Sequence, residues 1–304
     1  MKKLRETFVD LMLEIGSKDK TLVVLVGDIS HGILKPFAEK FPDRYYNIGI
    51  CEPSIVNLAA GLKKAELNPV VHTIAPFISE RSYEQIKLDF GYQKLGVNFV
   101  TIGSTFDYSK LGCSHHCYSD VSLLSHFENS NIFIPGSNIE FDNLFRNAYK
   151  KNSINYFRLT DNSHEVKIDE KILIGKAIKI TNGNDITLAV IGSQLKNAQK
   201  AYLILKKKNI SCEIIYFPTI KPFDNKTFIK SVKKTKKFIS IEELSASDGL
   251  YNLCLKAIKG DFLYKSDQIA IKKFVHEYGT YDHLCKITGL SCANIVNRVK
   301  KLLY

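Results

Sequence analysis

The sequence predicts an α/β protein with two consecutive domains, each built on an open, mostly parallel sheet. Short apolar segments such as Leu22–Val26 alternate with longer segments of helical period along the chain. Apolar runs without polar alternation are typical of strands that helices cover on both faces. The chain has 304 residues, of which 45% are hydrophobic and 24% charged, and this length and composition fit two globular domains.

The first predicted domain, residues 1–165, begins with a helix, because Leu4, Phe8 and Leu11 recur on one helical face. Strands and helices then alternate, which is typical of βαβ units and a parallel sheet. The predicted strands are Leu22–Val26, Tyr45–Ile50, Val70–Ile74, Val97–Ile102, Asn131–Pro135 and Asn155–Leu159. The predicted helices that follow are Pro53–Ala65, Arg81–Gln93 and Ile139–Tyr149.

The second predicted domain, residues 166–304, follows the polar segment Asp161–Lys171, which has no clear period and is interpreted as a linker. A turn signal at residues 182–185 separates its first two strands. The predicted strands are Ile174–Ile180, Ile186–Ile191, Cys212–Tyr216 and Phe238–Ile241. The predicted helices are Ser193–Lys207, Lys226–Lys236, Gly249–Ile258 and Ala293–Leu303.

The composition argues against several classes of protein. No stretch approaches the 18 apolar residues of a membrane span, and acids interrupt the amphipathic N-terminal segment, so it does not have the pattern of a secretory signal. Seven cysteines, an odd number, fit reduced thiols and a cytoplasmic location. The net charge of +12 comes from lysines spread along the chain without alternating aromatic residues, which favours solvated helix faces over nucleic-acid binding.

Glu52 is the strongest candidate for chemistry. In open α/β sheets ligands bind beyond the carboxyl ends of the strands, and Glu52 lies in such a loop, next to a helix that begins at Pro53. One interpretation is a helix-capping acid, since partial positive charge gathers at a helix N-terminus. The residues around it are mostly apolar, which favours a shielded carboxyl group that acts as a proton donor.

Several segments carry motifs in a fixed order through both domains: Tyr46–Leu62, Phe77–Ile86, Gly112–His115, Asn184–Leu188, Pro218–Asp224 and Ser240–Glu243. In this order they resemble the thiamine-diphosphate-dependent transketolase family. The resemblance covers nearly the whole chain, residues 4–303. It extends only to the pyrimidine-binding and C-terminal domains of a full transketolase.

The resemblance implies a split enzyme. The family's diphosphate-binding domain has a Gly-Asp-Gly segment and a later Asn that hold Mg²⁺ and the diphosphate, and the sequence has no such pair. Gly27-Asp28-Ile29 is a partial likeness, but it precedes the Glu52 motif. We therefore expect a partner chain of transketolase N-terminal type that supplies the Mg²⁺ ligands, no metal ligand on this chain, thiamine diphosphate bound across the interface, and an α2β2 assembly.

The resemblance also assigns roles to residues. Glu52 would hydrogen-bond N1′ of the aminopyrimidine and favour the imino tautomer that takes the proton from C2. Phe77 would stack on that ring, although an ordinary core aromatic is the simpler interpretation of Phe77 alone. Ile74 and Arg81 would lie beside the cofactor, and His115 would contact the sugar. Further expected substrate-binding residues are Asp28, Ser30, His31 and Arg158; for the first three, turn formation after a strand is the alternative.

The sequence departs from the family pattern where the sugar phosphate is usually held. Asp161 falls where the phosphate-binding arginine is expected, and Gly103 falls near the position of an additional substrate histidine. An acid at that place repels a phosphate dianion. The expected reaction is therefore transfer of a two-carbon ketol unit to or from an unphosphorylated or nucleotide-linked sugar, as in surface-polysaccharide biosynthesis.

Other functions remain open from the sequence. One alternative keeps the cofactor, as the β subunit of a 2-oxo-acid or acetoin dehydrogenase, although those subunits tend to carry a Tyr-His-Ser-type sequence where this chain has residues 112–115. Another is a non-catalytic regulatory subunit. Zinc at residues 113–117 is disfavoured, because structural zinc sites usually join two separated pairs of ligands and the sequence has no second pair.

Overall fold

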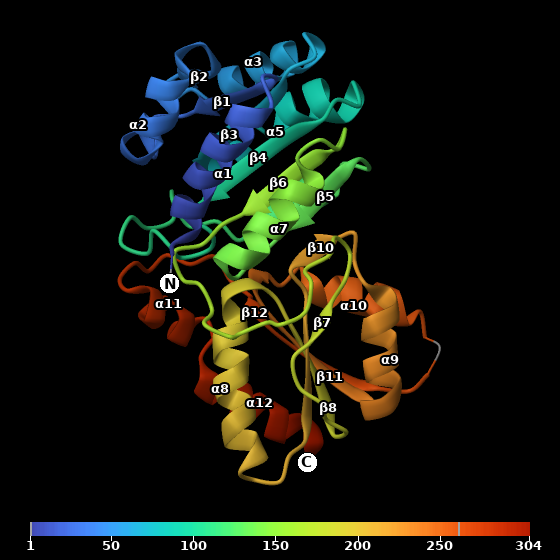
Figure 1. Ribbon diagram of the computed structural model, residues 1–304. Helices are drawn as coiled ribbons and strands as arrows, with labels where there is room; N and C mark the ends of the chain where they lie inside the picture. Colours follow the sequence, from blue (N-terminus) through green and yellow to red (C-terminus); the bar gives the residue numbers. More distant parts are fainter. Residues whose placement is uncertain (1, 261) are drawn as a thin grey trace.

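Two separate sheets organise the chain, as the alternation of strands and helices predicts. The computed structural model describes residues 2–260 and 262–304, and Figure 1 shows one sheet above the other. The first sheet has the order β10-β5-β6-β4-β3-β1-β2 and the second β12-β11-β8-β9-β7. Neighbouring strands are parallel except for the pairs β10–β5 and β7–β9. The predicted α/β class with mostly parallel sheets is confirmed.

The first sheet is covered by helices on both faces. Its strands are β1 (Leu22–Val26), β2 (Tyr45–Asn47), β3 (Asn68–Ile74), β4 (Val97–Ile102), β5 (Ser130–Phe133), β6 (Ile154–Arg158) and β10 (Thr219–Lys221). Its helices are α1 (Leu4–Lys18), α2 (His31–Lys40), α3 (Glu52–Lys64), α4 (Ala75–Ser79), α5 (Tyr83–Gln85), a π-helix over Ile86–Tyr92, α6 (Asp120–Ser125) and α7 (Asn138–Ala148). Within β1, Val24 packs in the same core cluster as α1 and α7, and Leu25 in that of α3.

The second sheet has the same layered plan. Its strands are β7 (Ile178–Lys179), β8 (Ile186–Val190), β9 (Cys212–Tyr216), β11 (Lys237–Ser245) and β12 (Lys265–Ile271). Its helices are α8 (Leu195–Lys206), α9 (Asn225–Thr235), α10 (Leu250–Ile258), α11 (Tyr281–Ile287) and α12 (Cys292–Leu303). The apolar residues of α8 and α12 share one core cluster, and those of α9 and α10 share the other.

Strand β10 joins the two halves of the chain. It comes from the second half but pairs with β5 at the edge of the first sheet, at the junction seen in Figure 1. The carbonyl oxygen of Pro218 accepts from the backbone N–H of Ile134 at 2.8 Å, and Lys221 Nζ donates to the carbonyl oxygen of Ser125 at 3.0 Å. An unpaired sheet edge is thereby covered. One strand from beyond the predicted domain boundary at residues 165 and 166 therefore belongs to the first sheet.

Several predicted elements are wrong in extent, and some were missed. The strand predicted for Tyr45–Ile50 ends at Asn47, shortly before Gly49 with its φ of 81°. The helix predicted for Arg81–Gln93 begins only at Tyr83 and continues as a π-helix. Only two residues of Ile174–Ile180 form a strand. The sequence analysis did not predict α2, α4, α6, α11, β10 or β12.

No helix in the described part of the chain is long and apolar enough to cross a membrane. All seven cysteines are free thiols.

We predict that Phe157→Ala destabilises the protein strongly. Phe157 is fully buried in β6, and its ring lies 4.7 Å from that of Phe133 and 5.1 Å from that of Phe145, measured between centroids. Truncation leaves a cavity and should lower the free energy of unfolding by about 3–5 kcal/mol. Urea denaturation measures the change. Tyr92→Ala, at an 84% exposed position, is the control and should change it by less than about 0.5 kcal/mol; equal effects would contradict the prediction.

Candidate functional site

The candidate site lies at the carboxyl ends of the parallel strands of the first sheet, around the start of α3. Glu52 is the first residue of this helix and is completely buried, with Pro53 in the first turn. Its Oε2 accepts a hydrogen bond from Arg81 Nη1 at 2.7 Å. Its Oε1 receives only a long bond, 3.4 Å, from Thr73 Oγ1. One carboxylate oxygen is therefore firmly held, while the other retains hydrogen-bonding capacity.

Gly27, the residue after β1, packs closely against the side chains that surround Glu52. A Cβ at Gly27 would lie 3.5 Å from Glu52 Oε1, 3.1 Å from Thr73 Oγ1 and 3.2 Å from the side chain of Ile55. The contacts with Thr73 and Ile55 are tight enough that these side chains would have to shift, whereas the contact with the carboxylate is an ordinary van der Waals distance. The residue after β1 thus shapes the surroundings of Glu52.

A row of flat side chains continues from Glu52. The Arg81 guanidinium lies 4.3 Å above the ring centroid of Phe77, a cation–π contact. The ring of Phe77 meets that of His115 edge-on at 5.2 Å, and His115 meets Tyr108 at 5.9 Å. The fold thus brings together the predicted residues Glu52, Phe77, Arg81 and His115 from three segments: the start of α3, α4 with the residues after it, and the loop after β4.

His115 is suited to proton exchange near neutral pH. Partial burial lowers its pKa from the ordinary value, and the positive charge of Arg81 lowers it further. Its Nδ1 lies 3.0 Å from Ser114 Oγ. The lowered pKa keeps the imidazole neutral and able to accept a proton.

The predicted residues Asp28, Ser30 and His31 form a strained turn after β1. Asp28 and Ser30 have φ angles of 54° and 56°, which non-glycine residues rarely adopt. Asn47 Oδ1 accepts from the Asp28 backbone N–H at 3.0 Å, and Ser30 Oγ lies 2.9 Å from His72 Nε2. His31 is exposed at the start of α2. Strain of this kind persists where surrounding contacts fix it, and it is frequent at binding sites.

Our expectation that Arg158 binds substrate needs correction. Its side chain is only 1% exposed, and its donors are turned into the protein. Nε donates to Asp120 Oδ2 at 2.8 Å, and Nη2 donates to Thr105 Oγ1 at 2.7 Å. A guanidinium committed to these buried acceptors has no surface to offer a sugar. The β6 position, with side chains buried along its whole length, explains the difference.

The departure at Asp161 is accompanied by a compensating cation that the sequence analysis missed. Arg5 Nη2 of α1 donates to Asp161 Oδ2 at 2.7 Å. Close by, burial raises the pKa of Asp107 to about 7, although Asn162 and Thr160 donate to its carboxylate. Only the tertiary contact between α1 and the segment after β6 reveals Arg5, because 156 positions separate it from Asp161.

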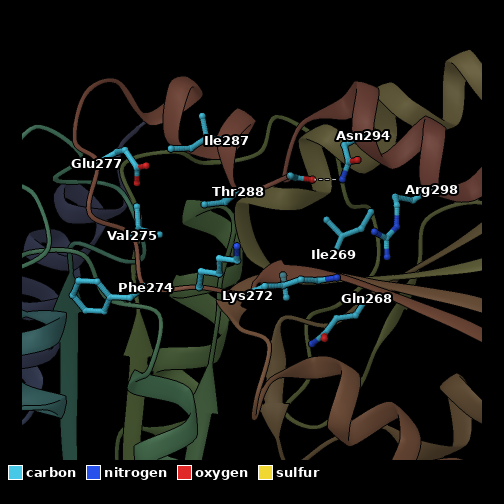
Figure 2. Close-up of a pocket in the computed structure, with 13 residues that line it drawn as sticks. Gln268, Ile269, Lys272, Phe274, Val275, Glu277, Ile287, Thr288, Asn294 and Arg298 are labelled. Carbon is cyan, nitrogen blue, oxygen red and sulfur yellow. Dashed lines mark hydrogen bonds between the residues drawn. The ribbon is translucent and has the colours of Figure 1, made fainter.

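A cavity of about 460 Å³ lies elsewhere, in the second domain between β12 and helices α11 and α12 (Figure 2). Lys272 and Lys273 line it, together with Arg298, whose guanidinium pairs with Asp267. None of the predicted site residues lines this cavity. We assign it no function. In the described residues no group of three or more His, Cys, Asp or Glu side chains is arranged to hold a metal ion.

Comparison with known proteins agrees with the geometry. The pyrimidine binding domain of transketolase matches residues 1–165, and the transketolase C-terminal domain matches residues 175–295. The chain belongs to the transketolase family. It is 28% identical to a putative transketolase C-terminal section from Methanocaldococcus jannaschii, and the match covers 98% of this chain and 95% of that one.

Transketolases of split type are among the other relatives. The chain is 27% identical to the 6-deoxy-6-sulfo-D-fructose transketolase subunit SqwH of a Clostridium species, covering 96% of this chain and 92% of that one. It is 31% identical to one subunit of the apulose-4-phosphate transketolase of Actinobacillus succinogenes, covering 84% and 83%. Its fold matches a split-gene transketolase solved as an inactive β4 tetramer, with a TM-score of 0.88 at 23% identity over 99% and 97% of the two chains.

The residues present fit the aminopyrimidine of thiamine diphosphate, the cofactor that the transketolase family implies. Glu52 Oε1 has hydrogen-bonding capacity to spare. The half-buried Phe77 ring packs against Arg81, which holds the other carboxylate oxygen, and the half-buried Ile74 follows Thr73 at the end of β3. One carboxylate and a flat apolar wall are the groups that such a ring needs.

We predict that His72 makes stability pH-dependent below neutrality. Burial lowers its pKa from 6.5 to about 4, so the unfolded chain binds a proton that the folded chain excludes. Above pH 6.5 the effect vanishes, and stability is lost as the pH falls toward 4. Between pH 7 and pH 5 the loss should be about 2 kcal/mol. We expect urea denaturation of His72→Gln to show a free energy of unfolding that no longer loses this amount, about 2 kcal/mol, between pH 7 and pH 5.

The exposed His126 supplies the control for this measurement. His126→Gln should keep the wild-type difference in the free energy of unfolding between pH 7 and pH 5. A His72→Gln variant with an unchanged slope would contradict the assignment.

Proposed function

We propose that the chain is the β-type subunit of a split, thiamine-diphosphate-dependent transketolase, which transfers a two-carbon ketol unit between sugars. The observation that carries the proposal is the completely buried Glu52, with one oxygen held by Arg81, which also packs on the Phe77 ring, and the other oxygen retaining hydrogen-bonding capacity. The match of two family domains over most of the chain, and relatives named as transketolase subunits, support it.

The residues of this chain would divide the work. When bound, thiamine diphosphate supplies the carbon acid whose carbanion accepts and releases the two-carbon unit. Glu52, shielded from water, would hold a proton at N1′ of the aminopyrimidine, while Arg81 keeps the carboxylate oriented. Phe77 and Ile74 would exclude water from that ring. His115, neutral near pH 7, would exchange a proton with a sugar hydroxyl.

A partner chain is part of the proposal. The metal and diphosphate ligands would come from a transketolase N-terminal-type subunit, which holds Mg²⁺ and completes the cofactor site in an α2β2 assembly. Exposed apolar side chains beside the site, Ile50 at 71% and Leu58 at 40%, offer surface for such a contact. Seven free cysteines support a reducing compartment, the cytoplasm.

The charges near the site bear on the substrate. The Arg5–Asp161 pair leaves neither group unopposed, and Asp107 lies next to it. A phosphate at this place would meet two carboxylates and an arginine that is already paired, so we propose an acceptor or donor sugar that carries no phosphate at this end. Two of the relatives above are named for a sulfonated sugar and for apulose 4-phosphate, so split transketolases are not confined to one kind of sugar.

We predict that Glu52→Gln lowers kcat by about 10²-fold or more when the chain is assayed with its partner subunit. An amide cannot exchange a proton with the ring nitrogen. Coupled spectrophotometric assay of ketol transfer measures the loss. The control is Glu39→Gln, at a side chain that is 66% exposed on α2. An unchanged rate for Glu52→Gln would remove this carboxyl group from the mechanism.

A substrate panel tests the second part of the proposal. With the partner present, unphosphorylated sugars should be better substrates, by kcat/KM, than the standard pentose phosphates. Asp161→Arg should raise the phosphate preference about tenfold, since a cation replaces an acid, and Asp161→Asn should raise it less. Full wild-type activity on pentose phosphates would overturn the substrate assignment while leaving the role of Glu52 intact.

A further inference from the structure

The loop that carries His115, residues 103–118, is closed at its base by one short bridge. The backbone N–H of Thr105 donates to the carbonyl oxygen of Cys117 at 2.7 Å, and the N–H of Cys117 donates back to Thr105 at 3.0 Å. We call this pair the neck of the loop. Two residues beyond it, His115 contacts Phe77 and Tyr108 through ring edges. His115 itself makes one side-chain hydrogen bond, to its neighbour Ser114.

The backbone of the neck is strained. Thr105 has a φ of 47°, although it is β-branched, a residue type for which a positive φ is a genuine outlier. Such a conformation costs about 1–3 kcal/mol and persists only where other contacts determine it. The completely buried hydroxyl of Thr105 provides two of them: Oγ1 donates to the carbonyl oxygen of Glu243 at 2.6 Å and accepts from Arg158 Nη2 at 2.7 Å.

Arg158 ties both sides of the neck to β6. The same Nη2 that bonds Thr105 also donates to the carbonyl oxygen of Cys117 at 2.8 Å. Asp120, at the start of α6, holds Nε at 2.8 Å, and Glu243 Oε1 lies 3.7 Å from Nη1. All three charged side chains are buried, so the guanidinium is fixed in position and charge. This buried network therefore holds both sides of the neck in place.

The second domain supplies the other half of this support. Glu243 lies in β11, and the backbone N–H of Ser245 donates to the carbonyl oxygen of Tyr118 at 2.8 Å. The segment after β12, which passes Phe274, Val275 and Glu277 in Figure 2, reaches the same loop. Its Gly279 N–H donates to the carbonyl oxygen of Ser109 at 3.0 Å. The loop is therefore clamped between the two domains.

We propose that Thr105 and Arg158 are positioning residues, which hold the neck against Glu243 so that His115 stays oriented beside Phe77. This gives the second domain a function in a site to which it contributes no reacting group. The inference rests on the proposed function, because it assigns the orientation of His115 a value in catalysis. Misplacement of a reacting group by about 1 Å can cost about 10²-fold in rate.

The test compares three variants in the complete chain with its partner subunit. Thr105→Val keeps the shape and removes the hydroxyl, and Thr105→Ser keeps the hydroxyl. Thr187→Val is the matched control, because Thr187 is also a buried threonine whose hydroxyl lies within 2.8 Å of two other hydroxyls, in β8 of the second domain. Thr105→Val should lower kcat/KM for the sugar about tenfold or more and shift its pH profile, with thiamine diphosphate affinity within about twofold of wild type.

Thr105→Ser should restore at least half of the wild-type kcat/KM, and Thr187→Val should lower only the melting temperature. Equal losses of kcat/KM in Thr105→Val and Thr187→Val, or wild-type kcat/KM in Thr105→Val, would overturn the inference. If Thr105→Val does not fold, Arg158→Lys takes its place: it keeps the buried charge but loses the fork of donors, and the same loss of kcat/KM is expected.

Amide hydrogen exchange separates this inference from the proposed function. In Thr105→Val, exchange should rise in residues 103–118 and stay unchanged around Glu52; in Thr187→Val it should not rise in that loop. This readout needs no activity. If the wild-type pair shows no ketol transfer, the proposed function fails, and exchange still decides whether the hydroxyl fixes the loop; an unchanged loop would overturn the positioning role by itself.

Discussion

The structure depends on one carboxylate that is withdrawn from water at the start of a helix. A buried charge is costly unless it is paired and hydrogen-bonded, and Glu52 has a single ionic partner, Arg81, which is itself half-exposed. The arrangement orients one oxygen and leaves the other with little to bind. Parallel strands, whose carboxyl ends share one edge of the sheet, then bring Thr73 and Gly27 to the same point from two further segments.

Around this carboxylate, the loops of the site are held by hydrogen bonds from other segments of the chain. The turn after β1 is held by Asn47 and by His72, whose other ring nitrogen is bound to the carbonyl oxygen of Val100 in β4. The loop after β4 is held by Arg158 and by the second domain. In each case a buried polar side chain on a strand hydrogen-bonds to a residue of the loop. Side chains on rigid strands therefore fix the positions of the loop residues.

The two domains form one mechanical unit. Strand β10 extends the first sheet from the second half of the chain, and the end of β11 bonds to the loop that carries His115. A third link is the buried cluster of Glu140, His164 and Tyr216, which joins α7, the linker and β9 through hydrogen bonds of 2.6–2.7 Å. Buried polar groups that hydrogen-bond across a junction favour one relative placement of the domains.

The sequence by itself determined the fold class, the order of the main strands and the chemically unusual residues. Unbroken apolar runs such as Leu22–Val26 and Val97–Ile102 have one favourable solution, a strand covered on both faces, and the structure has strands there. Glu52 stood out by its place before an apolar helix, whereas Phe77, Arg81 and His115 were identified through the ordered motifs that resemble the transketolase family. Short or polar elements, such as β10 and α2 with its internal Pro36, carry too little local signal to be predicted.

Only the tertiary structure decided which of these residues come together around Glu52 and which are buried in hydrogen-bonded contacts with the rest of the protein. Arg158 looks like a binding residue in a linear motif, yet β6 lies inside the sheet and turns its side chain toward Asp120, Thr105 and Cys117. Arg5 gains a role only through contact with Asp161, far away in sequence. Hydrophobic periodicity is a local property and is written in the sequence, whereas the partner of a charge depends on which distant segments the packed sheets bring together.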